Sequence, residues 1–183
     1  MSENAMVWKS IFLNGHEYCR VWQDAEFNYL SGAAVFSTDH RPTRLDYSIS
    51  CDHQWRSVSA HVSGWHGDEE VDIGITVKNG VWLMNDSEQK DIAGAIDVDL
   101  NFSPSTNLLP IRRLNLKMGE QAEVSAAWLR FPSFKLEPLR QIYRRTGENS
   151  YRYESGGGTF VKELEVNSLG LVTSYPDVWE AES

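Results

Sequence analysis

Apolar and polar residues alternate along several segments of this chain with a period of two residues. Residues 45–51, 58–62 and 71–77 each carry an apolar side chain at every second position and a polar or small one between. Successive side chains of a β-strand point to opposite faces, so this alternation predicts strands with one buried face. Asn79-Gly80 separates the third segment from the apolar residues 81–84, and this dipeptide predicts a tight hairpin.

The same pattern continues through most of the remaining chain. Further strands are predicted over residues 17–22, 27–36, 111–117, 122–131, 151–153, 160–166 and 171–175. Two segments, residues 87–92 and 138–145, have the composition of short helices, and the second begins with a proline. About ten short strands at regular spacing are typical of an antiparallel barrel or sandwich, so we predict a mainly β fold.

The length of 183 residues and the balance of residue types favour one globular domain. We expect a single β-rich domain over residues 1–183, with flexible ends at 1–7 and 180–183. Lysine and arginine total 17 against 26 aspartates and glutamates, which gives a net charge of −9. An acidic chain lacks the positive surface that nucleic-acid binding requires, so no nucleic-acid partner is expected.

The sequence also bears on location and on the cysteines. No run approaches the roughly 18 apolar residues of a membrane-spanning helix, and no secretory signal is recognisable, so we expect a cytoplasmic protein without stable membrane insertion. Cys19 and Cys51 are too few for a structural zinc site and are predicted to be buried free thiols. The sequence leaves the oligomeric state open.

One group of residues has the composition of an acid–base or metal site. Asp52, His53, His61 and His66 supply imidazoles and a carboxylate that can orient one of them. None of these histidines has the close spacing of metal-ligand motifs, and phosphate-binding and nucleophile-elbow motifs are missing. We therefore predict no metal, no cofactor and no catalytic residue, and we expect the histidines at strand ends.

Carboxylates and arginines form a second group. Asp97 and Asp99 lie two apart, hence on one side of a predicted strand, and Arg112 and Arg113 follow in the next predicted strand. Neighbouring strand residues point to opposite faces, so one arginine is expected to be buried and paired with Asp97 or Asp99. The alternative is an arginine fork that binds a phosphate or hydroxyl groups of a ligand.

Aromatic residues are abundant, with seven each of Trp, Tyr and Phe. Several have polar neighbours on predicted strands: Trp55, Trp82, Trp128, Tyr143, Tyr151, Tyr153, Tyr175 and Trp179. Aromatic rings pack on sugar rings and acyl chains, while their polar atoms form hydrogen bonds. A β-barrel of this size can enclose a ligand cavity, although the same rings can also fill a core.

Several motifs, in order from about Trp8 to Trp179, resemble the bacterial putative glycolipid-binding protein family. The matching segments are Y-S-I-S-C-D-H-Q-W from Tyr47, G-V-W at residues 80–82, D-V-D-L at 97–100, T-N-L-L-P-I-R-R-L at 106–114, Q-I-Y at 141–143, Y-R-Y-E-S at 151–155, and G-L-V-T-S-Y-P-D-V-W at 170–179. Ser105 departs from the pattern, in which an aromatic residue precedes the Thr-Asn pair.

The resemblance implies a strongly curved antiparallel sheet, an incomplete barrel similar in shape to periplasmic lipoprotein carriers. It also implies a lipid or glycolipid held on the concave face without catalysis. The residues then expected to bind the ligand are Tyr47, Asp52, Trp55, Trp82, Asp97, Asp99, Asn107, Arg112, Arg113, Tyr143, Tyr153 and Tyr175. Two alternatives remain: an enzyme using Asp52 and His53 or Asp97 and Asp99 as acid–base groups, and an interaction module with a filled core.

Overall fold

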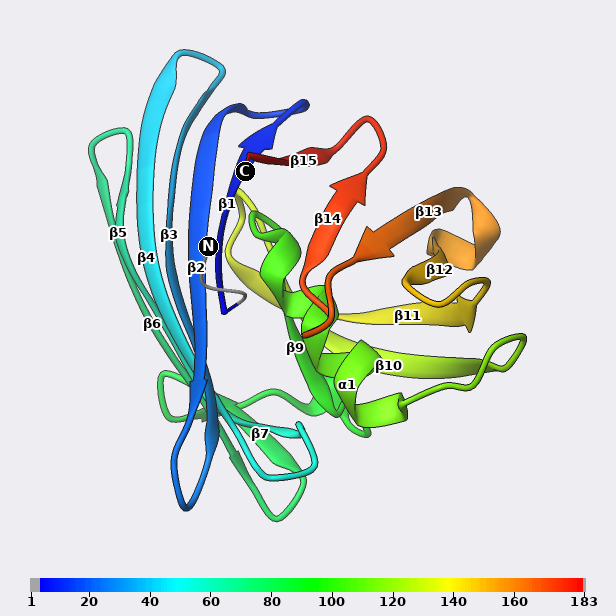
Figure 1. Cartoon of the computed structure of the whole chain (residues 1–183). Coiled ribbons are helices and arrows are strands. Elements are labelled where there is room, and N and C mark those ends of the chain that lie inside the picture. Colours follow the sequence, from blue (N-terminus) through cyan, green and yellow to red (C-terminus); the bar gives the residue numbers. More distant parts are fainter. Residues whose placement is uncertain (1–3, 183) are drawn as a thin grey trace.

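The computed structural model describes residues 4–182, and most of these residues belong to one sheet (Figure 1). Its strands are β1 (Ala5–Ser10), β2 (Asn14–Gln23), β3 (Asn28–Thr38), β4 (Arg41–Cys51), β5 (Ser57–His66), β6 (Glu69–Lys78), β7 (Val81–Met84), β8 (Ser87–Glu88), β9 (Asp97–Leu100), β10 (Gln121–Arg130), β11 (Lys135–Arg145), β12 (Ser150–Ser155), β13 (Phe160–Val166), β14 (Val172–Tyr175) and β15 (Trp179–Glu182). The helices are the 3-10 turns η1 (Lys90–Ile92), η2 (Pro104–Asn107) and η3 (Gly156–Gly158), and α1 (Leu108–Leu114).

The sheet consists of two antiparallel halves. One half runs from β8 to β1 and the other from β15 to β10, and the pairing of β1 with β15 joins them. At the far edge β9 pairs with β10 in parallel. Strong curvature brings β9 near the start of β5, where the Ser57 hydroxyl accepts a 2.9 Å hydrogen bond from the Val98 amide. The sheet is nevertheless not closed into a barrel, which confirms the predicted fold class.

Alternation decides which face of each strand is buried. In β4, Thr43, Leu45, Tyr47, Ile49 and Cys51 are buried, and the residues between them are exposed or only partly buried. Asn79 and Gly80 both have positive φ, 52° and 79°, as the predicted hairpin between β6 and β7 requires. Cys19 and Cys51 are buried free thiols, as expected.

The strand predicted over residues 111–117 is wrong, because residues 108–114 form α1. The Ser103 hydroxyl accepts a hydrogen bond from the Ser105 amide, and Pro104 follows at the first position of η2, which starts the helical segment. Asn115 ends it with a left-handed conformation, φ 43°. Leu108, Leu109 and Ile111 are buried, and Figure 1 shows α1 between the two halves of the curved sheet.

The helix predicted over residues 138–145 is also wrong, because this segment belongs to β11. Proline has no amide hydrogen to donate to a neighbouring strand. Pro138 is tolerated in β11 because β12 pairs with β11 only from Gln141 onward, so β12 has no residue that pairs with Pro138. The predicted helix at residues 87–92 is instead the two-residue strand β8 followed by η1.

The two chain ends are structurally joined. Residues 5–7 and 180–182, which the sequence assigned to flexible ends, belong to the paired strands β1 and β15; residues 1–3 and 183 lie outside the described part. The indole nitrogen of Trp8 in β1 donates a 2.6 Å hydrogen bond to the Val172 carbonyl in β14. Within residues 4–182, no helix has the length and apolar character to span a membrane.

Candidate functional site

Two cavities lie beside the helical segment of residues 104–114. The first, which we call the aromatic pocket, has a volume of about 540 Å³ and lies between the β1–β2 turn, the end of β9 with η2, and β12 to β15. Its apolar lining consists of Phe12, Leu13, Leu100, Pro104, Trp128, Leu139, Tyr153, Phe160, Tyr175, Val178 and Trp179. Its volume is in the range of small-molecule sites.

A carboxyl group lies in the wall of the aromatic pocket. Asp99 is only partly exposed, and its Oδ2 accepts a 2.7 Å hydrogen bond from the Gln141 amide. The same amide nitrogen lies 3.1 Å from the Tyr153 hydroxyl. Desolvation raises the pKa of Asp99 to about 6, while the bond from Gln141 opposes the rise. A carboxyl group in this setting changes its charge close to neutral pH.

Aromatic rings surround this carboxyl group. The Tyr153 ring centroid is 5.1 Å from that of Tyr143 and 6.1 Å from that of Tyr175. The Tyr143 hydroxyl donates a 2.8 Å hydrogen bond to the side-chain oxygen of Asn107, which fixes the end of η2 against β11. Five of the predicted ligand-binding residues, from five different elements, are therefore brought together at one pocket or directly behind its wall.

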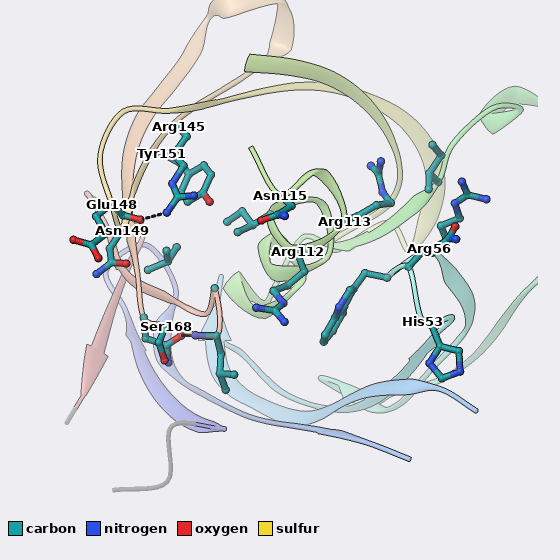
Figure 2. Close-up of a pocket in the computed structure, with 18 residues that line it drawn as sticks. His53, Arg56, Arg112, Arg113, Asn115, Arg145, Glu148, Asn149, Tyr151 and Ser168 are labelled. Atoms are coloured by element: carbon teal, nitrogen blue, oxygen red, sulfur yellow. Dashed lines mark hydrogen bonds between the residues drawn. The ribbon is translucent and has the colours of Figure 1, made fainter. Parts of the chain in front are cut away.

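The second cavity, which we call the arginine pocket, has a volume of about 680 Å³ at the C-terminal end of α1 (Figure 2). It is lined by residues 53–56, by Ile96, by the end of α1, and by the loops around residues 145–151 and 166–170. Arg56, Arg112, Arg113 and Arg145 all contribute to this lining.

Arg113 is neutralised by a buried partner. Its guanidinium makes two hydrogen bonds to Asp97, one of them 3.0 Å from Nε to Oδ1. The Asp97 side chain is 1% exposed and that of Arg113 is 12% exposed. Burial raises the pKa of Asp97, and the charge of Arg113 counteracts that rise. The ion pair expected from the sequence is present, although Arg113 reaches Asp97 from a helix and not from a strand.

Arg112 has a different environment. Its guanidinium carbon lies 5.6 Å from the centre of the Trp55 ring, a cation–π distance. Trp55 has a left-handed φ of 63° in the turn after Asp52. The Asp52 carboxylate accepts hydrogen bonds from the amides of Gln54 at 2.8 Å and Arg56 at 2.9 Å. Asp52 thus stabilises the turn that presents Trp55 and does not line either pocket.

Two predicted ligand-binding residues lie in the interior. The Trp82 side chain is buried and donates a 3.0 Å hydrogen bond to the Ala95 carbonyl. Tyr47 is buried behind the aromatic pocket, where its hydroxyl lies 2.7 Å from the Ser105 hydroxyl and 3.3 Å from that of Ser103. Only Ser103 of this cluster lines the pocket.

The carboxyl group at the centre of this cluster, that of Glu17, is not among the residues predicted from the sequence. Glu17 is 1% exposed, and its Oε1 accepts hydrogen bonds from the hydroxyls of Tyr47 and Ser103. Its Oε2 has no hydrogen-bond partner among the described residues. Desolvation raises the pKa of Glu17 to about 8. The alternation of apolar and polar residues could have identified this buried carboxyl group, since Glu17 shares the buried face of β2 with Cys19 and Val21.

The predicted histidine group does not converge. His61 lies 2.7 Å from Asp72 on the surface, and His66 lies 2.8 Å from the Thr43 hydroxyl in a buried position. His53 is exposed beside the arginine pocket. Across residues 4–182, no three His, Cys, Asp or Glu side chains come together in a way that could hold a metal ion.

Comparisons with other proteins agree with this architecture. A family model described as Putative glycolipid-binding matches residues 5–181. A crystal structure of a DUF1089 family protein from Pseudomonas aeruginosa has a TM-score of 0.78 and 26% identity, and the match covers 90% of this chain and 91% of that one. A beta-barrel-like protein of the domain of unknown function DUF1849 from Brucella abortus shares the fold, with a TM-score of 0.54, 9% identity, and coverage of 98% and 94%. No curated protein gives a significant match.

Proposed function

The chain belongs to the Putative glycolipid-binding family, and from this premise we propose that it binds a glycolipid in the aromatic pocket. The observation that carries the proposal is a carboxyl group, Asp99, held by Gln141 in the wall of a cavity of about 540 Å³ that is otherwise mostly apolar and aromatic. Such a cavity suits a ligand with an apolar part and several hydroxyl groups.

The polar groups of the pocket match the chemistry of a sugar. An ionised Asp99 accepts hydrogen bonds from sugar hydroxyls, and the Asn107 amide lines the same cavity. The faces of Tyr153, Phe160 and Tyr175 offer surfaces on which the C–H side of a sugar ring packs. Gln141 holds the carboxyl group in place, so its orientation does not depend on the ligand.

The apolar lining suits an acyl chain. Leu100, Leu139, Trp128 and Val178 line the cavity together with Phe12, whose side chain is 81% exposed in the β1–β2 turn. Each methylene group transferred from water to such a surface contributes about 0.8 kcal/mol. A chain of eight carbons therefore supplies several kcal/mol, while the sugar contacts supply selectivity.

We further propose that the protein binds its ligand without transforming it. The acid–base pairs weighed from the sequence are engaged elsewhere: Arg113 holds Asp97, and the Asp52 carboxylate caps the turn of residues 53–56. Two cavities of several hundred Å³ favour a binding role over a filled-core interaction module.

Isothermal titration calorimetry with n-octyl β-D-glucoside, kept below its critical micelle concentration, tests the proposal. The matched probe is an octyl ethylene-glycol ether, which has the same chain and no sugar. We expect saturable binding of the glucoside, at least fivefold tighter than that of the ether. Asp99→Asn should remove this preference while both probes still bind.

The control variant is Asp72→Asn, a surface carboxylate outside both pockets, which should behave as the wild type. Equal affinity of the wild type for glucoside and ether would contradict the sugar site. Absence of saturable binding of either probe would contradict the aromatic pocket as a lipid site.

A further inference from the structure

The arginine pocket concentrates positive charge in an acidic protein. The chain has a net charge of −9, yet four arginines line this cavity and the lining contains a single acid, Glu148. They come from three parts of the chain: Arg56 from the turn before β5, Arg112 and Arg113 from α1, and Arg145 from the end of β11. Basic residues interact favourably with the C-terminus of a helix, which accounts for Arg112 and Arg113 on α1. It does not account for the presence of Arg56 and Arg145 in the same cavity.

The arginines differ in how far their charge is compensated. Arg113 is paired with Asp97 inside the fold. Arg145 donates to the backbone carbonyls of Leu116, Gly147 and Glu148, and its guanidinium lies 5.8 Å from the Tyr151 ring centre. Carbonyl groups fix the position of the Arg145 guanidinium but do not cancel its charge, so Arg145 keeps a positive field on its side of the cavity.

Arg112 lies over an aromatic ring and has free hydrogen-bond donors. Trp55 supports its guanidinium, and among residues 4–182 that guanidinium has neither a hydrogen-bond acceptor nor a carboxylate partner. Figure 2 shows Arg112 projecting from α1 into the space between the segment of Ser168 and that of His53, while Asn115 lies at the side of the cavity nearer Tyr151. A guanidinium stacked on an aromatic ring loses little conformational freedom when it binds a planar or tetrahedral anion.

We infer that the arginine pocket is a binding site for a phosphate group, with Arg112 as the principal donor. Arg56 and Arg145 flank the site and supply charge, and Asn115 adds an amide. The volume of about 680 Å³ accommodates more than the anion alone, so the group can belong to a larger molecule. The inference does not rest on glycolipid binding, since it concerns a separate cavity with its own residues.

The test is titration calorimetry at low ionic strength with three probes: inorganic phosphate, dihexanoyl phosphatidic acid and dihexanoyl phosphatidylcholine, the lipids as monomers. We expect saturable binding of at least one of the first two, and at least tenfold weaker binding by Arg112→Ala. Binding of inorganic phosphate identifies the anion alone as sufficient, whereas binding of phosphatidic acid without phosphate identifies a lipid headgroup. Phosphatidylcholine, whose phosphate carries a compensating cation, should bind more weakly.

The matched control is Arg140→Ala, because Arg140 is an arginine with an 84% exposed side chain outside both pockets. It should bind the probes as the wild type does. Arg56→Ala, a second exposed site, should also weaken binding and is independent of the Trp55 stack. The inference is overturned when neither phosphate nor phosphatidic acid binds saturably, or when Arg112→Ala and Arg56→Ala bind them as tightly as the wild type.

Discussion

The Ser103 hydroxyl donates a 2.9 Å hydrogen bond to the Glu17 carboxyl group, across a sequence separation of 86 residues. Glu17 belongs to β2, while Ser103 precedes η2 and lines the aromatic pocket. This bond, together with that from Tyr47 in β4, fastens the helical segment to the sheet. The position of one pocket wall thus depends on a buried ionisable group.

The free energy of unfolding should depend on pH because the pKa of Glu17 is raised in the folded protein. Its pKa is raised from 4.5 to about 8 in the folded protein, so the native state holds a proton that the unfolded chain releases. The contribution of protonated Glu17 is fully present below pH 4.5 and is lost as the pH rises through 8. The free energy of unfolding should therefore fall between these values by about 1.4 kcal/mol per pH unit.

Glu17→Gln carries an uncharged side chain of the same shape and should remove this slope. Urea unfolding of both proteins from pH 6 to pH 9 measures it, and the difference between them isolates Glu17 from groups such as His66. The variant should be more stable than the wild type above pH 8. Parallel curves for the two proteins would show that Glu17 titrates normally.

The two neighbouring arginines of α1 should differ in their effect on stability. Arg113→Ala leaves the buried Asp97 without its partner and should cost about 3–5 kcal/mol. Arg112→Ala removes only an exposed stack on Trp55 and should cost less than about 1 kcal/mol. Urea unfolding at pH 7 compares them, and equal losses would contradict the assignment of Arg113 as the structural residue.

The β15 strand should be required for the cohesion of the sheet. Trp179 is 4% exposed, and β15 is the link between β1 and β14. Trp179→Ala should destabilise the protein by about 3–5 kcal/mol. Trp65→Ala, at a site that is 51% exposed, is the control and should cost much less. Thermal unfolding followed by circular dichroism measures the stability of both variants. A small loss of stability for Trp179→Ala would contradict the claim that β15 holds the two halves of the sheet together.

Binding of octyl glucoside should depend on the ionisation of Asp99. Its pKa of about 6 means that the carboxylate, the better hydrogen-bond acceptor, predominates at pH 7 and is a minor species at pH 5. Affinity should therefore be severalfold lower at pH 5 than at pH 7, up to about tenfold, because the protonated form is expected to bind as weakly as Asp99→Asn. Asp99→Asn should bind equally at both values; a wild-type affinity that does not change with pH would contradict the role of the carboxylate.

Local patterns carried much of the information about the fold. Alternation in residues 45–51 and 71–77 and the Asn79-Gly80 turn identified strands and a hairpin, because strand periodicity and turn geometry depend on neighbouring residues. Local patterns failed at residues 111–117, which were predicted as a strand although residues 108–114 form α1. Burial of Leu108, Leu109 and Ile111 between the halves of the sheet decided for a helix.

Strand periodicity and family motifs in the sequence were enough to predict a mainly β protein of the Putative glycolipid-binding family. Which side chains meet in the two pockets and in the core depends on the folded chain. The tertiary structure paired Arg113 with Asp97, left Arg112 on Trp55, placed Asp99 against Gln141, and buried Glu17. Curvature of the sheet and the path of η2 and α1 bring together residues that are far apart in sequence, and burial then raises the pKa values of Glu17, Asp97 and Asp99.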